Sequence, residues 1–458
     1  MHRRDLLTLT AGLAAVGGSL AARSVMAQTS ADAPSAEPPR LALLLGNRDY
    51  PDGDDLPSIH KNVRDLRAAL ERRGFSCTES LDQDRASARE TIERFARAVR
   101  QAPAQSTVFF YFSGHGAQID AENLLVGARQ SPKAPAPLLD RGSLKLASDI
   151  LAMLPTRPQG LTIAVIDACR TSLKSAQTSD GLNQVEAPEG TLIAFATGAG
   201  RPAIAPAVET INTFYTASLV KLMDSASGEI SFSDLFQLVK ADVQHTMLNH
   251  PLALLRQFAQ FPFTAENVRI RRQLAPSLPT DVASGENTRF SDANEAQDFE
   301  LLEAAVWPAE VLRLARVFLQ RHPSSKLAGS AQVAQTGAAE AAKILRRNDV
   351  RLYRSAFRLE AMPNEQQADL FKAGRGDKDA AVRLGRYWRT QADLRDLPAL
   401  DRYEGWLQYA AALGNGIAAY ELALFYRRMD QPQPAATFES RARELGYTPP
   451  PSLDNIRK

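Results

Sequence analysis

The sequence contains very little cysteine, because Cys77 and Cys169 are the only two in 458 residues. Two distant thiols exclude a disulfide-stapled scaffold and the zinc clusters that need several closely spaced thiolates. The six histidines are scattered without the spacing of metal ligands. We therefore expect no metal and no other cofactor. The net charge of +2 is too small to indicate nucleic acid as a partner.

Long apolar runs are also missing after the N-terminal segment, so no membrane span is expected in the exported chain. Residues 1–27 carry Arg3-Arg4 before an apolar stretch and end in Val25-Met-Ala27, which is the pattern of a signal peptide. The paired arginines resemble the twin-arginine type and predict a periplasmic location. An ordinary secretory signal and an uncleaved anchor are the alternatives. Residues 28–40 form an Ala/Pro/Ser-rich linker.

Two six-residue apolar runs in the middle of the chain each lead into a reactive residue. Thr-Val-Phe-Phe-Tyr-Phe precedes Ser113-Gly-His-Gly116, and Leu-Thr-Ile-Ala-Val-Ile precedes Asp167-Ala-Cys-Arg170. Such runs are typical of strands buried on both faces of a parallel sheet. Ligands bind beyond the carboxyl ends of these strands. We therefore predict that both strands end with their apolar runs, and that His115 and Cys169 meet at that edge.

A cysteine and a histidine placed side by side can perform nucleophilic catalysis. The histidine takes the thiol proton near neutral pH and later gives it to the leaving group. The thiolate that results is a strong nucleophile. His115 and Cys169 are therefore the predicted catalytic residues. The backbone N–H groups of Gly116 and Cys169 are the predicted oxyanion donors.

The two tetrapeptides resemble those of the caspase/metacaspase superfamily of cysteine peptidases, especially its bacterial members. Asp167 stands where the caspase signature has Gln, and Thr171 stands where it has Gly. An Asp at the first position is what metacaspases and their bacterial relatives carry. The resemblance covers residues 41–272 and implies an α/β fold with a caspase-like, mostly parallel sheet flanked by helices. It also implies cysteine-type endopeptidase activity on peptide or protein substrates.

The resemblance further suggests which residues bind the substrate. Asp167 would line the primary pocket, where its carboxylate favours a substrate Arg or Lys; its alternative role is to cap the nearby loop. A second pocket acid of the family comes from the first helix, where this chain has Asn62; Asp54 or Asp55 in the preceding loop could substitute for it. Thr197 and Gly198 would lie beside the bound peptide, with a simple turn as the alternative. Arg48 is the residue type that aspartate-cleaving caspases carry in the first loop, but this loop is otherwise acidic, which disfavours cleavage after Asp.

Three further features concern maturation and regulation. In family members that cleave themselves the cut falls in the region of residues 171–188, so Lys174 is a candidate site, with a plain loop as the alternative. A Cys77–Cys169 disulfide is disfavoured because Cys77 falls in the second predicted strand. Asp52-Gly-Asp-Asp55 is too short to indicate a calcium site, so calcium dependence is unknown.

The C-terminal part has a different character. A Pro/Ser/Gly-rich linker at residues 273–289 leads into residues 290–458, which are Ala-rich and helical in pattern. The stretch from Phe318 to Ala328 resembles the end of a tetratricopeptide-type helix pair. Ala380-Ala-Val-Arg-Leu-Gly385 is echoed by Ala418-Ala-Tyr-Glu-Leu-Ala423, and residues 406–415 between them resemble the intervening helix of Sel-type repeats. Such helix pairs stack into solenoids that can dock protein partners. A plain helical bundle is the alternative.

We therefore predict an exported cysteine endopeptidase with a His115–Cys169 dyad that cleaves after Arg or Lys. The main alternative is a catalytically silent caspase-like scaffold that recruits protein partners through its helical repeats. A third possibility is another Cys–His acyl transfer reaction. The presence of both dyad residues argues against the scaffold.

Overall fold

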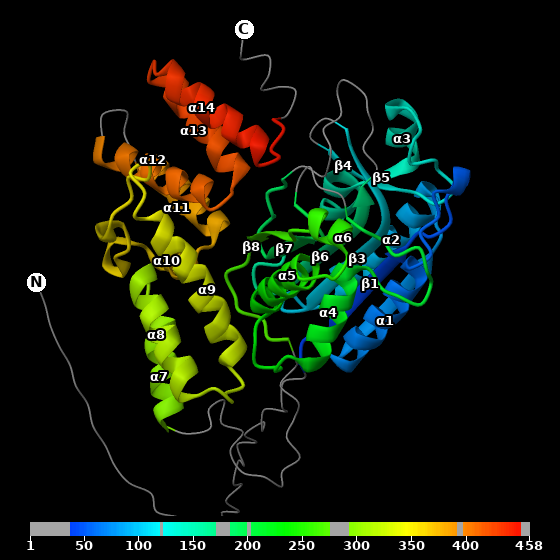
Figure 1. Ribbon diagram of the computed structural model, residues 1–458, viewed down its shortest axis with the longest axis horizontal. Coiled ribbons are helices and arrows are strands. Elements are labelled where there is room, and N and C mark those ends of the chain that lie inside the picture. Colours follow the sequence, from blue (N-terminus) through cyan, green and yellow to red (C-terminus); the bar gives the residue numbers. More distant parts are fainter. Residues whose placement is uncertain are drawn as a thin grey trace, which may run out of the picture. The chain divides into compact units, whose positions relative to one another are not determined.

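A central eight-stranded sheet organises the first part of the chain, as seen in the computed structural model (Figure 1). The structure describes residues 37–119, 122–170, 184–198, 203–274, 293–391 and 397–449, so the predicted signal peptide and Lys174 lie outside the described residues. The strands are β1 (Arg40–Gly46), β2 (Phe75–Leu81), β3 (Thr107–Ile119), β4 (Glu122–Val126), β5 (Ser143–Lys145), β6 (Leu161–Arg170), β7 (Thr191–Phe195) and β8 (Phe263–Asn267).

The strand order is β2-β1-β3-β6-β7-β8, with β4 and β5 added beside the end of β3. Neighbours from β2 to β7 are parallel, whereas β8 runs antiparallel to β7. The β3–β4 and β4–β5 pairs are also antiparallel. The prediction of an α/β fold with a mostly parallel sheet flanked by helices is therefore confirmed.

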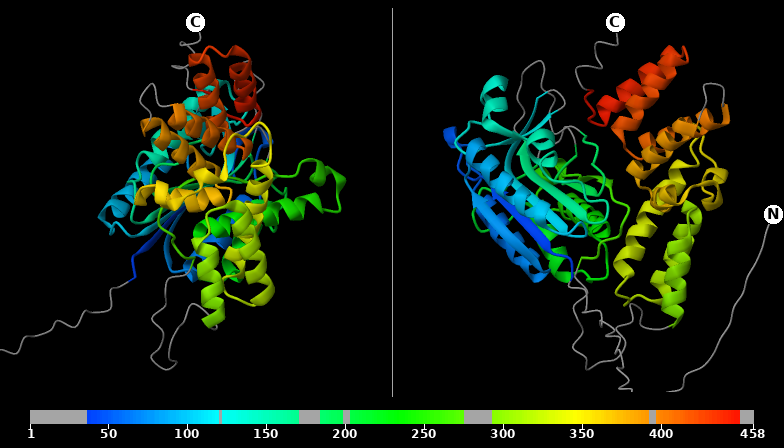
Figure 2. Two further views of the ribbon diagram at one scale, coloured as in Figure 1. Left: turned by 90° about the vertical axis from the view of Figure 1, so that its left-hand side faces the viewer. Right: turned by 180° about the vertical axis from the view of Figure 1, so that it is seen from behind.

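Helices cover both faces of the sheet because its central strands are apolar on both sides. On one face Phe109 and Tyr111 pack against α1, α4 and α5. On the other face Val108 and Phe110 pack against α2. Figures 1 and 2 show these two helical layers around the twisted sheet. The helices of this part are α1 (Ile59–Arg72), α2 (Arg85–Gln101), α3 (Ala136–Gly142), α4 (Phe214–Ser225), α5 (Phe232–Leu248) and α6 (Ala253–Gln257).

Both motif-bearing strands extend further than the sequence predicts. β3 continues through Ser113-Gly-His-Gly116 to Ile119, and β6 continues to Arg170. The prediction that they end with their apolar runs is therefore wrong. The physical reason is that the two strands keep pairing with each other beyond the end of β1, and β4 supplies β3 with a new neighbour.

The remaining described residues are mostly helical, as predicted for the C-terminal part. Each helix from α7 to α9 and from α10 to α14 packs on its neighbour in sequence. None of the helices described here is both long and apolar enough to cross a membrane. The repeat type stays a prediction. The helices are α7 (Ala293–Ala304), α8 (Pro308–Arg321), α9 (Ala328–Ile344), α10 (Asn364–Gly374), α11 (Lys378–Gln391), α12 (Leu397–Ala412), α13 (Gly416–Arg428) and α14 (Pro432–Glu444).

The helical part also covers the outer edge of β8. Lys378 Nζ donates to the carbonyl of Thr264 at 2.6 Å, and Arg383 Nη1 donates to the carbonyl of Glu266 at 2.8 Å. The Glu266 N–H donates to Asp379 Oδ2 at 3.0 Å. An uncovered edge strand can pair with other chains. Side chains of α11 satisfy these outward backbone groups and so close this edge of the sheet.

Candidate active site

The strand register brings the two predicted catalytic residues next to each other. β3 and β6 are adjacent parallel strands, and His115 and Cys169 are direct Cα partners across them. Neighbouring strands lie about 4.8 Å apart, so the two backbones are in immediate contact. The Cys169 side chain lies outside the described part of the molecule. The predicted oxyanion residue Gly116 is the next Cα partner, opposite Arg170.

The His115 ring is buried and held by a backbone carbonyl. His115 is only 7% exposed, and its Nε2 is 2.8 Å from the carbonyl oxygen of Asp54. A carbonyl can only accept a hydrogen bond, so Nε2 carries the proton and Nδ1 is the unprotonated nitrogen of the neutral ring. Burial lowers the pKa of His115 from its usual value, and the Asp54 carbonyl opposes this effect. The ring is therefore a neutral proton acceptor at pH 7.

The residue whose carbonyl holds His115 also forms an ion pair through its side chain. Lys133 Nζ is 2.6 Å from Asp54 Oδ1. The positive charge of Lys133 also contributes to the lowered pKa of His115. Sequence analysis missed Asp54 in this role because the group involved is a backbone carbonyl, which every residue type carries.

Asp167 is fully buried and lies against the start of α4. Its Oδ2 accepts hydrogen bonds from the hydroxyls of Thr213, Thr216 (2.6 Å) and Tyr111 (3.4 Å). Its Oδ1 has no hydrogen-bond partner among the described residues. Burial raises the pKa of Asp167, although the three hydroxyls favour the ionised form. Thr213 is the N-cap of α4, so Asp167 supports the residue that begins this helix.

Asn62 of α1 belongs to the same buried cluster. Its Nδ2 donates to Ser113 Oγ at 3.2 Å and to Thr213 Oγ1 at 3.1 Å, while its Oδ1 accepts the Thr213 N–H at 3.1 Å. Thr213 thus bonds both Asn62 and Asp167. The sequence offered no signal for Thr213 beyond its position before an apolar helix. Its role depends on a loop fold that brings it to β6.

Thr197 and Gly198 follow β7, one strand beyond β6. Phe195 at the end of β7 pairs with Ile166 of β6. Thr197 and Gly198, two and three residues further on, therefore lie near the level of the Cys169 position. Thr197 is buried, and its hydroxyl has no partner among the described residues. A Cβ at Gly198 would lie 3.3 Å from the carbonyl of Phe261, which leaves little space for a side chain there.

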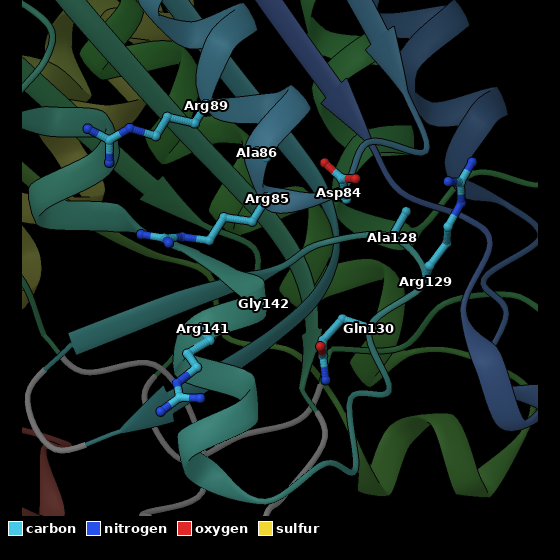
Figure 3. Close-up of a pocket in the computed structure, with 9 residues that line it drawn as sticks. All are labelled: Asp84, Arg85, Ala86, Arg89, Ala128, Arg129, Gln130, Arg141 and Gly142. Atoms are coloured by element: carbon cyan, nitrogen blue, oxygen red, sulfur yellow. The ribbon is translucent and has the colours of Figure 1, made fainter.

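The hollow drawn in Figure 3 is a different feature. Its volume is about 500 Å³, and none of the predicted site residues lines it. Arg85 and Arg89 at its wall form ion pairs with Asp149. In Figure 3 the side chains of Arg85 and Arg89 extend to the same side of the hollow, whereas that of Arg129 points away from them. Within the described ranges, no group of three His, Cys, Asp or Glu side chains could hold a metal ion.

Comparison with known protein families matches residues 39–271 to the caspase domain, slightly more than half of the chain. A search of curated proteins finds no match. The matched range begins just before β1 and ends shortly after β8, so it contains the whole sheet and both motif-bearing strands. A caspase domain is the scaffold of a cysteine peptidase, a class of hydrolase that acts on peptides or proteins. The chain therefore belongs to the caspase-domain family.

Proposed function

We propose that this chain is a cysteine endopeptidase in which Cys169 is the nucleophile and His115 is the general base. The pairing of these residues in the β3–β6 register is the observation that carries the proposal. With the Nε2 proton directed at Asp54, Nδ1 is the nitrogen available to take the thiol proton. The lowered pKa of His115 supports this role because the ring stays neutral at pH 7.

The reaction follows from these assignments. The Cys169 thiolate bonds to the scissile carbonyl carbon, and the carbonyl electron pair moves onto oxygen. The backbone N–H groups of Gly116 and Cys169 stabilise this oxyanion. The His115 imidazolium then gives its proton to the leaving amine as the C–N bond breaks. Water, deprotonated by His115, hydrolyses the thioester and releases the new carboxyl end.

Asp167 is the residue that we propose selects Arg or Lys before the scissile bond. Its Oδ1 has no partner in the described part of the chain, so it can accept a charge-assisted hydrogen bond from a cationic side chain. Cleavage after Asp is disfavoured because a substrate carboxylate would meet a like charge. Thr197 and Gly198 would pair with the extended peptide backbone. Asn62 would shape the same pocket without adding charge.

Hydrolysis of short fluorogenic peptides tests the nucleophile and the pocket together. We expect wild-type protein to cleave Arg and Lys peptides, and Cys169→Ala and His115→Ala to lose this activity. Cys77→Ala is the matched control, because burial raises the pKa of Cys77 to about 11 and leaves its thiol unreactive. Equal activity of wild type and Cys169→Ala would refute the nucleophile. If a thiol-directed peptidyl inhibitor fails to label Cys169, the silent scaffold is favoured instead.

Export and maturation complete the proposal. We propose that residues 1–27 direct the protein to the periplasm and are removed there. Cell fractionation and N-terminal sequencing of the mature protein test this. A cut after Lys174 that appears in wild type and is absent from Cys169→Ala would identify self-cleavage. The helical part would serve to dock a protein partner.

A further inference from the structure

His115 lies where β3 changes its neighbour. On one side β3 pairs with β1, and the last pair is Gly46 with Ser113. On the same side β4 takes over with the pair Gly116 and Leu125, since β6 occupies the other side through residue 116. His115 falls between these two pairings. Its backbone N–H is therefore bonded by neither β1 nor β4.

The hydroxyl of Tyr50 fills this gap. It accepts the His115 N–H at 3.0 Å and donates to the carbonyl of Val126 at 3.2 Å. Val126 follows Leu125, the β4 residue that pairs with Gly116. The hydroxyl thus bridges β3 and β4 at the point where a direct ladder bond is absent. A buried N–H left without an acceptor costs free energy, so this bridge fixes the local path of β3.

Tyr50 also contacts the ring that it supports. The Tyr50 and His115 ring centroids are 4.5 Å apart with an interplanar angle of 73°, an edge-to-face contact. A Cβ at Gly114 would lie 2.7 Å from the Tyr50 hydroxyl. Glycine at position 114 is therefore what lets the hydroxyl reach the backbone of β3.

One short turn holds both the backbone and the ring of His115. Tyr50 begins this turn, and its N–H donates to Asp55 Oδ1 at 2.7 Å. Asp54 in the same turn accepts the Nε2 proton of His115. Tyr50 itself contacts His115 at the backbone N–H and at the ring, so the position of Nδ1 depends on Tyr50 through two separate contacts.

We infer that Tyr50 is a positioning residue for the general base His115. The inference rests on the proposed function and deepens it. Tyr50 acts through His115, because its hydroxyl bonds the His115 backbone and its ring contacts the imidazole; it sets the distance and angle at which Nδ1 faces position 169. A small displacement of a catalytic group lowers the rate of chemistry more than the binding of substrate.

Tyr50→Phe is the direct test, because it keeps the ring and removes only the hydroxyl. We expect kcat on an Arg peptide to fall about 10- to 100-fold, with KM changed less than about two-fold. Tyr353→Phe is the matched control, since Tyr353 is 69% exposed and should leave both constants unchanged. Unchanged kcat in Tyr50→Phe, or a change in KM alone, would overturn the inference.

Gly114→Ala is a second variant, which crowds the hydroxyl without removing it, because the new Cβ would lie 2.7 Å from the Tyr50 hydroxyl and 2.9 Å from the Phe112 ring. It should show the same loss of kcat at nearly constant KM, and wild-type kcat in this variant would overturn the inference. Both variants are measured below their unfolding transitions, which circular dichroism locates.

Nuclear magnetic resonance of histidine-labelled protein separates this inference from the proposed function. In wild type we expect the Nε2–H tautomer of His115 to predominate, and in Tyr50→Phe we expect a mixture of tautomers and a shifted pKa. If wild type cleaves no peptide but the His115 signals change in this way, the proposed function fails and the positioning role stands. If the signals are the same in both proteins, the positioning role fails.

Discussion

Replacing Asp167 by Asn should separate folding stability from substrate recognition. Asp167 is fully buried, and three hydroxyls donate to its Oδ2. Asn keeps an oxygen that can accept from the same hydroxyls. It places an amide N–H₂ where Oδ1 has no described partner. Among the described residues, one polar group of this side chain therefore has no partner in either protein, and the difference between them is the charge.

The sign of the stability change follows from the raised pKa of Asp167. The folded state binds a proton more tightly than the unfolded state, whose Asp titrates near pH 3.9. The charge therefore lowers the free energy of unfolding at neutral pH, and this loss disappears as pH falls below about 3.9. Each unit by which the pKa is raised corresponds to about 1.4 kcal/mol. We expect Asp167→Asn to have a higher free energy of unfolding than wild type at pH 7, with no gain near pH 3.5.

The effect on catalysis should have the opposite direction. A hydrogen bond between ionised groups contributes about 1.5–3 kcal/mol, which is about 10- to 100-fold in a rate or binding constant. We expect kcat/KM for Arg and Lys peptides to fall by this factor in Asp167→Asn. A peptide with a neutral residue at the same position should be affected far less. The ratio of the two kcat/KM values is the measured quantity.

Urea unfolding at pH 7 and pH 3.5, together with the peptide assay, completes the test. Asp369→Asn is the control, because Asp369 is a buried carboxylate with a partner: Arg383 donates to it at 2.7–3.1 Å. Neutralising a paired buried acid should lower stability at pH 7 and leave the substrate preference unchanged. A less stable Asp167→Asn at pH 7, or an unchanged preference for Arg and Lys, would refute this reasoning.

Three further predictions concern the same structure. The acid limb of the kcat/KM profile should lie below about pH 6.5, because the pKa of His115 is lowered and the neutral ring is the base; a limb above this value would contradict the assignment. Lys133→Ala should move this limb to higher pH, since a nearby positive charge is removed, and the shift should shrink in high salt. A limb that does not move would show that Lys133 is too solvated to matter. Arg383→Met should lower the free energy of unfolding by about 3–5 kcal/mol because it leaves the Asp369 carboxylate buried and unpaired, and the double variant with Asp369→Leu should recover most of this loss in urea titrations. Wild-type stability of Arg383→Met would mean that the pair is solvated.

The sheet could be predicted because its signals are local. Two apolar runs, each followed by a tetrapeptide of known type, are sufficient to indicate adjacent parallel strands, and the register of His115 with Cys169 agrees with this. The ends of the strands could not be predicted in the same way. They depend on pairing between β3, β4 and β6, which are far apart in sequence, so no composition rule applies.

Most residues that surround the site could not be predicted from the sequence, for a related reason. The Asp54 carbonyl and the Tyr50 hydroxyl bond His115 because a turn places them beside it. Their residue types alone do not indicate this role. Thr213 reaches Asp167 from a loop that precedes α4. Such contacts depend on the folded path of the chain. A sequence pattern indicates which residues react, and it leaves open which residues hold them in place.

Asn62 illustrates how a departure from a family pattern can be physically consistent. A second carboxylate at this position would be close to Asp167, since the Thr213 hydroxyl bonds the side chains of both residues. Two buried carboxylates raise each other's pKa, and burial already raises the pKa of Asp167. The neutral amide instead donates to Ser113 and Thr213 and accepts from the Thr213 backbone, so all its contacts are satisfied. Because Asn62 adds no charge, the preference for basic residues would depend on a single carboxylate, and its strength should follow the ionisation of Asp167.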